Sequence, residues 1–152
     1  MKKTACLYFT TIVLGLSSVF AQEKDNISAE ETIDYINSKI TGIAKLENVK
    51  GLLLVEFYKN GKANRVDRVN IDKLNPENIE YIADEKALVV RCIADDCIDR
   101  RIEVPKTIGQ FSRMSFKGEY DAKAQTGLVK AFEHLIMLYR DRKYKNNTPF
   151  EN

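Results

Sequence analysis

The stretch Leu52-Leu53-Leu54-Val55-Glu56-Phe57-Tyr58-Lys59-Asn60-Gly61 decides the fold class of this chain. Its first seven residues are mostly aliphatic and aromatic, a composition typical of β-strands. The Asn-Gly pair that follows favours a type I′ turn, because both central residues of this turn need a positive φ. We therefore expect a β-hairpin whose return strand covers residues 63–71. Val66 and Val69 cannot share one face of a regular strand, so the return strand should contain a bulge or an irregular edge.

Further strands are predicted on the C-terminal side of this hairpin. Residues 87–93 and 97–104 are rich in β-formers, a turn around Asp95 joins them, and Pro105 ends the second strand. Residues 111–120 alternate in polarity and are bounded by Gly109 and Gly118, which predicts a last strand. Residues 75–78, Asn-Pro-Glu-Asn, are predicted to form a turn or a single helical turn.

A helix is predicted at each end of the folded chain. Ser28 and Glu31 form a capping box, and isoleucines at steps of three and four follow it. The second helix covers residues 122–143, and Phe132 and Leu135 lie at the centre of its apolar face. Because a sheet of local hairpins cannot bury both faces alone, we expect this helix to cover one of them. The predicted fold is α+β: an N-terminal helix, a curved antiparallel meander of about five to six strands, and a C-terminal covering helix.

The first 21 residues have the three parts of a secretory signal peptide. Lys2 and Lys3 come first, an apolar run follows, and Val19-Phe20-Ala21 places small residues where a signal peptidase cleaves. The apolar run is shorter than the roughly 20 residues that cross a bilayer. We therefore expect cleavage near Ala21, export to the periplasm or the medium, and no transmembrane segment afterwards. The mature chain divides into one α+β domain at residues 22–145 and a polar tail at residues 146–152.

The charge of the mature chain argues against a nucleic-acid partner. The formal net charge of +2 falls to zero once Lys2 and Lys3 leave with the signal. No global positive field remains that would attract nucleic acid or an acidic membrane.

Cys92 and Cys97 are the two cysteines of the mature chain, because Cys6 leaves with the signal. In a hairpin that places Ile93 beside Asp96, the two cysteines would also be neighbours, so a cross-strand disulfide is expected in an oxidising compartment. Two unpaired thiols are the alternative. A metal or redox site is disfavoured, because no further ligand completes a zinc site and the Cys-x-x-Cys spacing is missing.

No catalytic motif is present in the sequence. His134 is the single histidine, and its position on the second helix lies about 120° from the apolar face, so we expect it to be solvated. Asp95, Asp96 and Asp99 lie in a turn too short to supply the oxygen ligands of calcium. We therefore expect no catalytic residues, no metal ion and no cofactor.

Three segments carry a resemblance to a known group of proteins. They are Glu31-Thr32-Ile33-Asp34-Tyr35-Ile36-Asn37, Ala131-Phe132-Glu133-His134-Leu135-Ile136 and Pro149-Phe150. With the strand meander between the helices, they resemble uncharacterised small exported proteins of Bacteroidetes-type bacteria, whose layout is similar to a pleckstrin-homology-like half-barrel. The resemblance covers most of the mature chain and implies that fold, but it implies no established activity.

A cluster of basic residues surrounds the first hairpin: Lys59, Lys62, Arg65 and Arg68. In lipid-binding pleckstrin-homology domains, basic residues near the corresponding hairpin hold phosphorylated headgroups, so the resemblance implies an anion contact here. Asp67 interrupts the cluster. The alternative is a solvated edge whose cations prevent edge-to-edge pairing of strands.

These observations together favour an exported, non-enzymatic binding or scaffolding module of the bacterial cell envelope. Its partner would be an envelope protein or an anionic glycolipid. Two alternatives remain: a small thiol- or histidine-dependent enzyme, and a ligand carrier that uses the interior of the curved sheet. A polar interior cleft would favour the carrier, and an inward His134 near a free thiol would favour the enzyme.

Overall fold

The structure is a computed structural model of the chain, and it describes residues 27–146. The predicted signal peptide at residues 1–21, its cleavage site and residues 147–152 of the predicted tail lie outside the described residues. Asn146, assigned above to the tail, is the last residue of the C-terminal helix.

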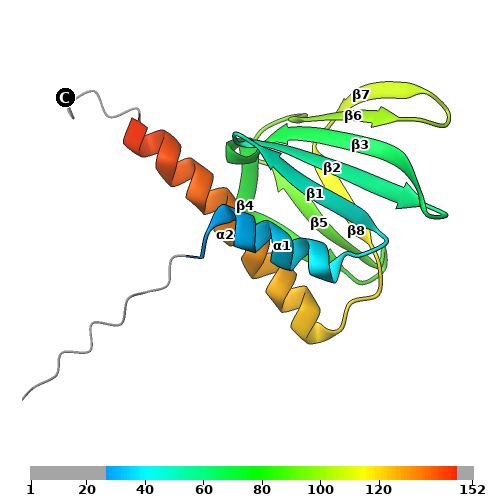
Figure 1. The fold of residues 1–152 in the computed structure, drawn as a ribbon, viewed down its shortest axis with the longest axis horizontal. Helices are drawn as coiled ribbons and strands as arrows, with labels where there is room; N and C mark the ends of the chain where they lie inside the picture. The colour runs from blue at the N-terminus through cyan, green and yellow to red at the C-terminus, as the bar shows by residue number, and fades with distance from the viewer. Residues whose placement is uncertain (1–26, 147–152) are drawn as a thin grey trace, which may run out of the picture.

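Within the described residues, eight antiparallel strands form two sheets, flanked by two helices (Figure 1). Sheet A has the strand order β1-β2-β3-β6-β7, and sheet B has the order β4-β5-β8. The structure confirms the α+β class, with a helix before the strands and another after them. The strands are β1 Ala44–Val49, β2 Leu52–Lys59, β3 Lys62–Asn70, β4 Leu74–Ile82, β5 Ala87–Cys92, β6 Ile98–Ile102, β7 Thr107–Phe111 and β8 Arg113–Lys117.

Residues 52–61 form β2 and the turn into β3. Asn60 and Gly61 have φ angles of 53° and 72°, as the predicted hairpin turn requires. Asn64 is an extra residue on β3, because Phe57 pairs with Arg65 whereas Tyr58 pairs with Ala63. The expected irregularity is therefore a bulge before the two valines.

Three strands go beyond the sequence prediction: β1, β4 and β7. The predicted turn at residues 75–78 is wrong, because these residues belong to β4. The pairing of β4 with β5 shifts between Leu74 and Ile79, and β4 is an edge strand of sheet B, so Pro76 is tolerated where a central strand would need its N–H. The predicted strand at residues 111–120 is also divided, because Ser112 separates β7 from β8.

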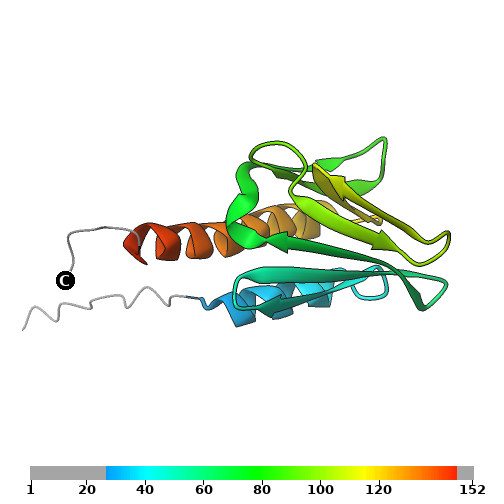
Figure 2. The ribbon, with the colours of Figure 1, turned by 90° about the horizontal axis from the view of Figure 1, so that it is seen from above.

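The helices are α1 Ala29–Lys39 and α2 Ala122–Asn146, which lie side by side along the sheets (Figure 2). The capping box of α1 is confirmed: Ser28 Oγ accepts from the Glu31 N–H, and Glu31 accepts from the Ser28 N–H. Phe132 and Leu135 of α2 are fully buried, as expected. The Phe132 ring centroid lies 5.3 Å from that of Phe116 on β8. The Phe116 centroid in turn lies 5.2 Å from that of Phe57 on β2, so one aromatic stack links α2 to both sheets.

The chain crosses between the sheets three times, and the crossings meet at one end of the strands. They are the short 3-10 helix η1 Ile71–Lys73, residues 93–97 and Ser112. The Ile93 N–H donates to the Lys73 carbonyl at 3.0 Å, and the Cys92 N–H donates to the Ser112 carbonyl at 2.8 Å. These bonds join the three crossings to one another at this junction. Beyond it, toward the β2–β3 turn, the sheets enclose a cleft.

Candidate functional site

The cleft between the sheets has a volume of about 910 Å³. Strands β2, β3 and β6 supply one wall, and β8 supplies residues of the other. Glu85 is the one acidic residue among the described residues that line it. We call it the basic cleft, because five basic side chains line it: Lys59, Arg65, Arg100, Arg113 and Lys117.

Asp67 and Arg100 form a buried ion pair beneath the basic cleft. They lie directly opposite each other on β3 and β6, and Asp67 is fully buried. Nε and Nη2 of Arg100 donate to the two carboxylate oxygens, each at 2.8 Å. Nη2 also donates to the Arg113 carbonyl at 3.0 Å, and the guanidinium lies 4.2 Å from the Phe111 ring centroid. The pair therefore fixes Arg100 between the two sheets.

Arg65 is the second guanidinium beside Asp67. Its Nε lies 3.3 Å from Asp67 Oδ1, an ion-pair contact that lacks the direction of a hydrogen bond. Within the described residues, its buried Nε and Nη2 have no hydrogen-bond partner. The guanidinium stacks on Phe57, its cross-strand neighbour, 3.5 Å from the ring centroid. Burial lowers the pKa of Arg65 to about 10, and the charge of Arg100 acts in the same direction against the opposing effect of Asp67.

The charges around Asp67 do not balance. Two guanidinium groups share one buried carboxylate, which leaves an excess positive charge in this part of the basic cleft. Lys59 and Lys117 have exposed side chains and add two further cations. Hydrogen bonds to an ionised group are roughly twice as strong as neutral ones, and partial burial strengthens the attraction further. The arrangement is therefore suited to holding an anion.

The structure separates the four basic residues of the predicted anion contact. Lys59 and Arg65 line the basic cleft, as an anion contact requires. Lys62 follows the hairpin turn and is not among the lining residues. Arg68 lies on the opposite face of β3, in a shallow hollow with Leu54 and Glu56. The four side chains therefore do not line one surface, because alternate residues of a strand point to opposite faces.

Arg100, Arg113 and Lys117 were missed by the sequence analysis. They are far from the hairpin in sequence, and the pairing of β3 with β6 and the crossing at Ser112 bring them to the cleft. A signal for Arg100 was present. Arg100 is in phase with the buried Ile98, just as Asp67 is in phase with the buried Val69. One acid and one base on the inward faces of two strands predict a buried pair.

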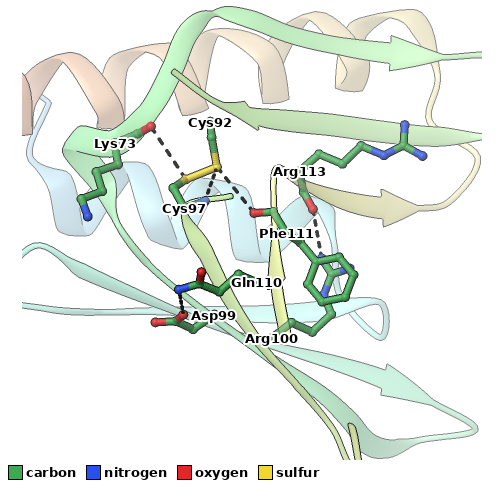
Figure 3. Close-up of a disulfide and its surroundings, with 8 residues drawn as sticks. All are labelled: Lys73, Cys92, Cys97, Asp99, Arg100, Gln110, Phe111 and Arg113. Atoms are coloured by element: carbon green, nitrogen blue, oxygen red, sulfur yellow. Dashed lines mark hydrogen bonds between the residues drawn. A yellow bond between two sulfur atoms is a disulfide. The ribbon is translucent and has the colours of Figure 1, made fainter. Parts of the chain in front are cut away.

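Cys92 and Cys97 form a disulfide next to the cleft (Figure 3). Their sulfur atoms are 2.06 Å apart, and their Cα atoms are 5.9 Å apart. The expected geometry was wrong, because β5 and β6 do not pair and belong to different sheets. The disulfide spans the crossing at residues 93–97 instead of a hairpin. It closes the junction at which the crossings meet, with Lys73 and Phe111 carbonyls close to its sulfur atoms.

His134 is less solvated than its helical position predicted. Its side chain is half-buried, and Nε2 lies 2.9 Å from the Ile27 carbonyl at the start of the described chain. It lines an apolar hollow of about 430 Å³ between α1 and α2, together with Tyr35 and Ala131. The Cys92–Cys97 disulfide instead lies at the junction of the sheets, so His134 and the cysteines do not form one site.

Within residues 27–146, no three His, Cys, Asp or Glu side chains are grouped so that they could hold a metal ion. Neither helix of that region contains an apolar stretch long enough to cross a membrane.

Comparison with known proteins gives no match: no protein-family model, no curated protein sequence and no solved structure is significantly similar to this chain. The geometry of the basic cleft is therefore the basis for a functional proposal.

Proposed function

We propose that the protein is an exported, non-enzymatic binding module of the bacterial cell envelope that holds an anionic ligand in the basic cleft. The observation that carries this proposal is the pair of arginines beside one buried carboxylate. Arg100 donates hydrogen bonds to both carboxylate oxygens of Asp67. Arg65 therefore has a single ion-pair contact with Asp67, and its buried donors have no hydrogen-bond partner among the described residues. Leaving a buried charged donor without a partner is costly, and a bound ion is one way to satisfy it. An anion beside Arg65 would supply the missing countercharge.

The position of the cleft favours a ligand carrier as the second candidate. The lining residues come from both sheets, so a ligand would lie between them and not on the outer face of the hairpin. A carrier and a scaffolding module differ in whether the bound ligand leaves with the protein. The enzyme alternative loses its proposed nucleophile, because both cysteines are in the disulfide.

A pair of double variants tests the proposal. Lys59→Gln with Arg65→Gln removes two cations that line the basic cleft, whereas Lys62→Gln with Arg68→Gln removes two from the same hairpin that do not. Both variants have the same net charge. We expect only the first double variant to reduce retention on isolated cell envelopes and binding of inorganic phosphate. Binding of phosphate and envelopes by the wild-type protein should weaken with added salt, because ions screen exposed charges over about 10 Å at 0.1 M.

Thermal unfolding of each variant provides the control for folding. An anion that binds the folded state raises the unfolding temperature of a competent protein. Equal losses in the two double variants would show that general charge and not the cleft is responsible. No loss in either would contradict the proposed site.

A further inference from the structure

We propose that the ligand of the basic cleft is an extended acidic peptide segment, which pairs as an added strand with the free edge of β8. This inference rests on the function proposed above and specifies the chemistry of its ligand.

The hydrogen-bond pattern of β8 defines which peptide groups are free. In an antiparallel pair, alternate residues direct their N–H and C=O groups toward the partner strand. The Gly118 N–H donates to the Lys86 carbonyl, and the Ser112 carbonyl accepts from Cys92, so even-numbered residues of this segment face β5. The Arg113 carbonyl accepts instead from Arg100 on the opposite edge. The peptide groups of Ser115 and Lys117 therefore point away from β5.

This edge of β8 is open and faces the basic cleft. β8 is the last strand of sheet B, and Ser115 and Lys117 both line the cleft. Among the described residues, no backbone or side-chain group forms a hydrogen bond with the outward peptide groups of these two residues. An exposed row of this kind is a template for pairing with another extended chain.

The open edge has two defined ends. At one end, the Arg113 carbonyl already accepts a hydrogen bond from Arg100. At the other end, Ile43 packs so closely on Gly118 that a Cβ built there would lie 2.7 Å from Ile43 Cδ1. Residues 114–117 lie between these limits and span roughly 10 Å of extended chain. A peptide of about three or four residues fits this length.

The charges of the cleft select the sequence of such a peptide. Side chains of a strand alternate between its two faces, so one set of a strand added to β8 would point toward Arg65 and Lys59. Carboxylates at every second position complement these cations. A lipid headgroup or free phosphate would meet the same cations, but it has no row of amide donors and acceptors to match those of Ser115 and Lys117.

Backbone methylation of a probe peptide tests the pairing. The parent probe is an acetylated and amidated peptide of about four residues that alternates glutamate with threonine. One derivative is N-methylated at every glutamate, the other at every threonine, and all three have the same charge. Only alternate N–H groups face a partner strand, so we expect one derivative to bind roughly tenfold more weakly than the parent and the other to bind about equally well.

Amide exchange locates the contact without any substitution. We expect the parent peptide to slow hydrogen exchange at Ser115 and Lys117, whereas Met114 and Phe116, whose peptide groups face β5, should change little. Lys59→Gln should weaken peptide binding, and Lys62→Gln, which is also exposed but lies outside the cleft, should not.

The outcomes distinguish the peptide from the anion site in general. If both methylated derivatives bind as well as the parent, strand pairing is wrong while the anion site remains. If inorganic phosphate binds in an Arg65-dependent manner and the peptide does not, the peptide proposal is again wrong and a phosphorylated ligand is favoured. If neither probe binds, the proposed function and this inference both fail.

Discussion

At the residue scale, Asp67 is the group on which the basic cleft depends. Asp67→Asn would remove the countercharge of Arg100 and leave that guanidinium among buried groups. We expect a loss of about 3–5 kcal/mol in the free energy of unfolding, the usual cost of breaking a buried pair by removal of one partner. Urea denaturation measures it. Asp95→Asn, an exposed residue of the 93–97 crossing, is the control and should change stability little. A near-neutral Asp67→Asn would contradict the buried pair.

Tyr120 makes the free energy of unfolding depend on pH in the alkaline range. Burial raises the pKa of Tyr120 to about 12, and Tyr81 acts in the same direction. An unfolded tyrosine has a pKa of about 10, so the folded state favours the neutral phenol. This stabilisation is fully present below about pH 10 and is lost as pH rises toward about 12.

Tyr120→Phe isolates this effect, because it removes the ionisable phenol of this one residue and keeps its ring. We expect the unfolding midpoint of the wild type to fall more steeply between about pH 10 and 12 than that of the variant. The urea midpoint at several pH values measures the difference. Parallel curves would show that Tyr120 ionises as freely as in the unfolded chain.

At the scale of elements, the aromatic stack is one of the links between α2 and the sheets. Phe132→Ala would leave a cavity beside Phe116, and we expect a loss of about 3–5 kcal/mol in the free energy of unfolding. Met137→Ala on the same helix is the control, because Met137 is 44% exposed. Thermal and urea unfolding compare the two variants. If Phe132→Ala were no worse than Met137→Ala, the described docking of α2 would be incorrect.

The disulfide belongs to the same scale, because it closes a crossing between sheets. A thiol assay on the denatured, unreduced mature protein should detect no free thiol. Replacement of both cysteines by serine removes a short loop constraint and should cost roughly 2 kcal/mol. Two reactive thiols in the wild-type protein would contradict the bond and restore a nucleophile to the enzyme alternative.

Short sequence motifs predicted the helix start and the hairpin turn, because capping and turn formation depend on neighbouring residues. Ser28 and Glu31 predicted the start of α1, and Asn60 with Gly61 predicted the hairpin. β4 was missed because Pro76 is typical of a turn, and only its place at a sheet edge makes it acceptable in a strand. β1 was missed because only Ala44 and Leu46 are buried in a segment of six residues.

The candidate site was harder to predict than the fold, since it depends on contacts between distant strands. Lys59 and Arg65 were identified from the hairpin alone. Arg100 and Lys117 join them only because β3 pairs with β6 and the chain turns at Ser112 from one sheet to the other. Loop lengths and composition do not determine that pairing. Arg68 was grouped with Arg65 because the two are close in sequence, although alternate residues of a strand point to opposite faces.

At the scale of the whole molecule, the sequence predicts that the mature protein begins at Gln22. We expect the natively expressed protein to have the mass of residues 22–152 and to be found outside the cytoplasm. Intact-mass measurement of periplasmic and medium fractions tests both statements. An Ala21→Leu substitution should block processing, whereas Gln22→Asn should allow it, because the peptidase reads small residues before the cut. Recovery of the full-length chain from the cytoplasm would contradict export.

The two sheets are interleaved along the chain, and this governs the order in which the protein acquires its structure during synthesis. Sheet A needs β6 and β7, which follow β4 and β5 of sheet B, and the last aromatic ring of the core comes from α2. A nascent chain that ends before Ala122 therefore lacks Phe132, the ring that packs on Phe116 from α2. Folding that depends on such distant contacts is slow. We expect the chain to remain unfolded until its synthesis is complete. An unfolded chain can pass through a narrow translocation channel, whereas a folded domain cannot.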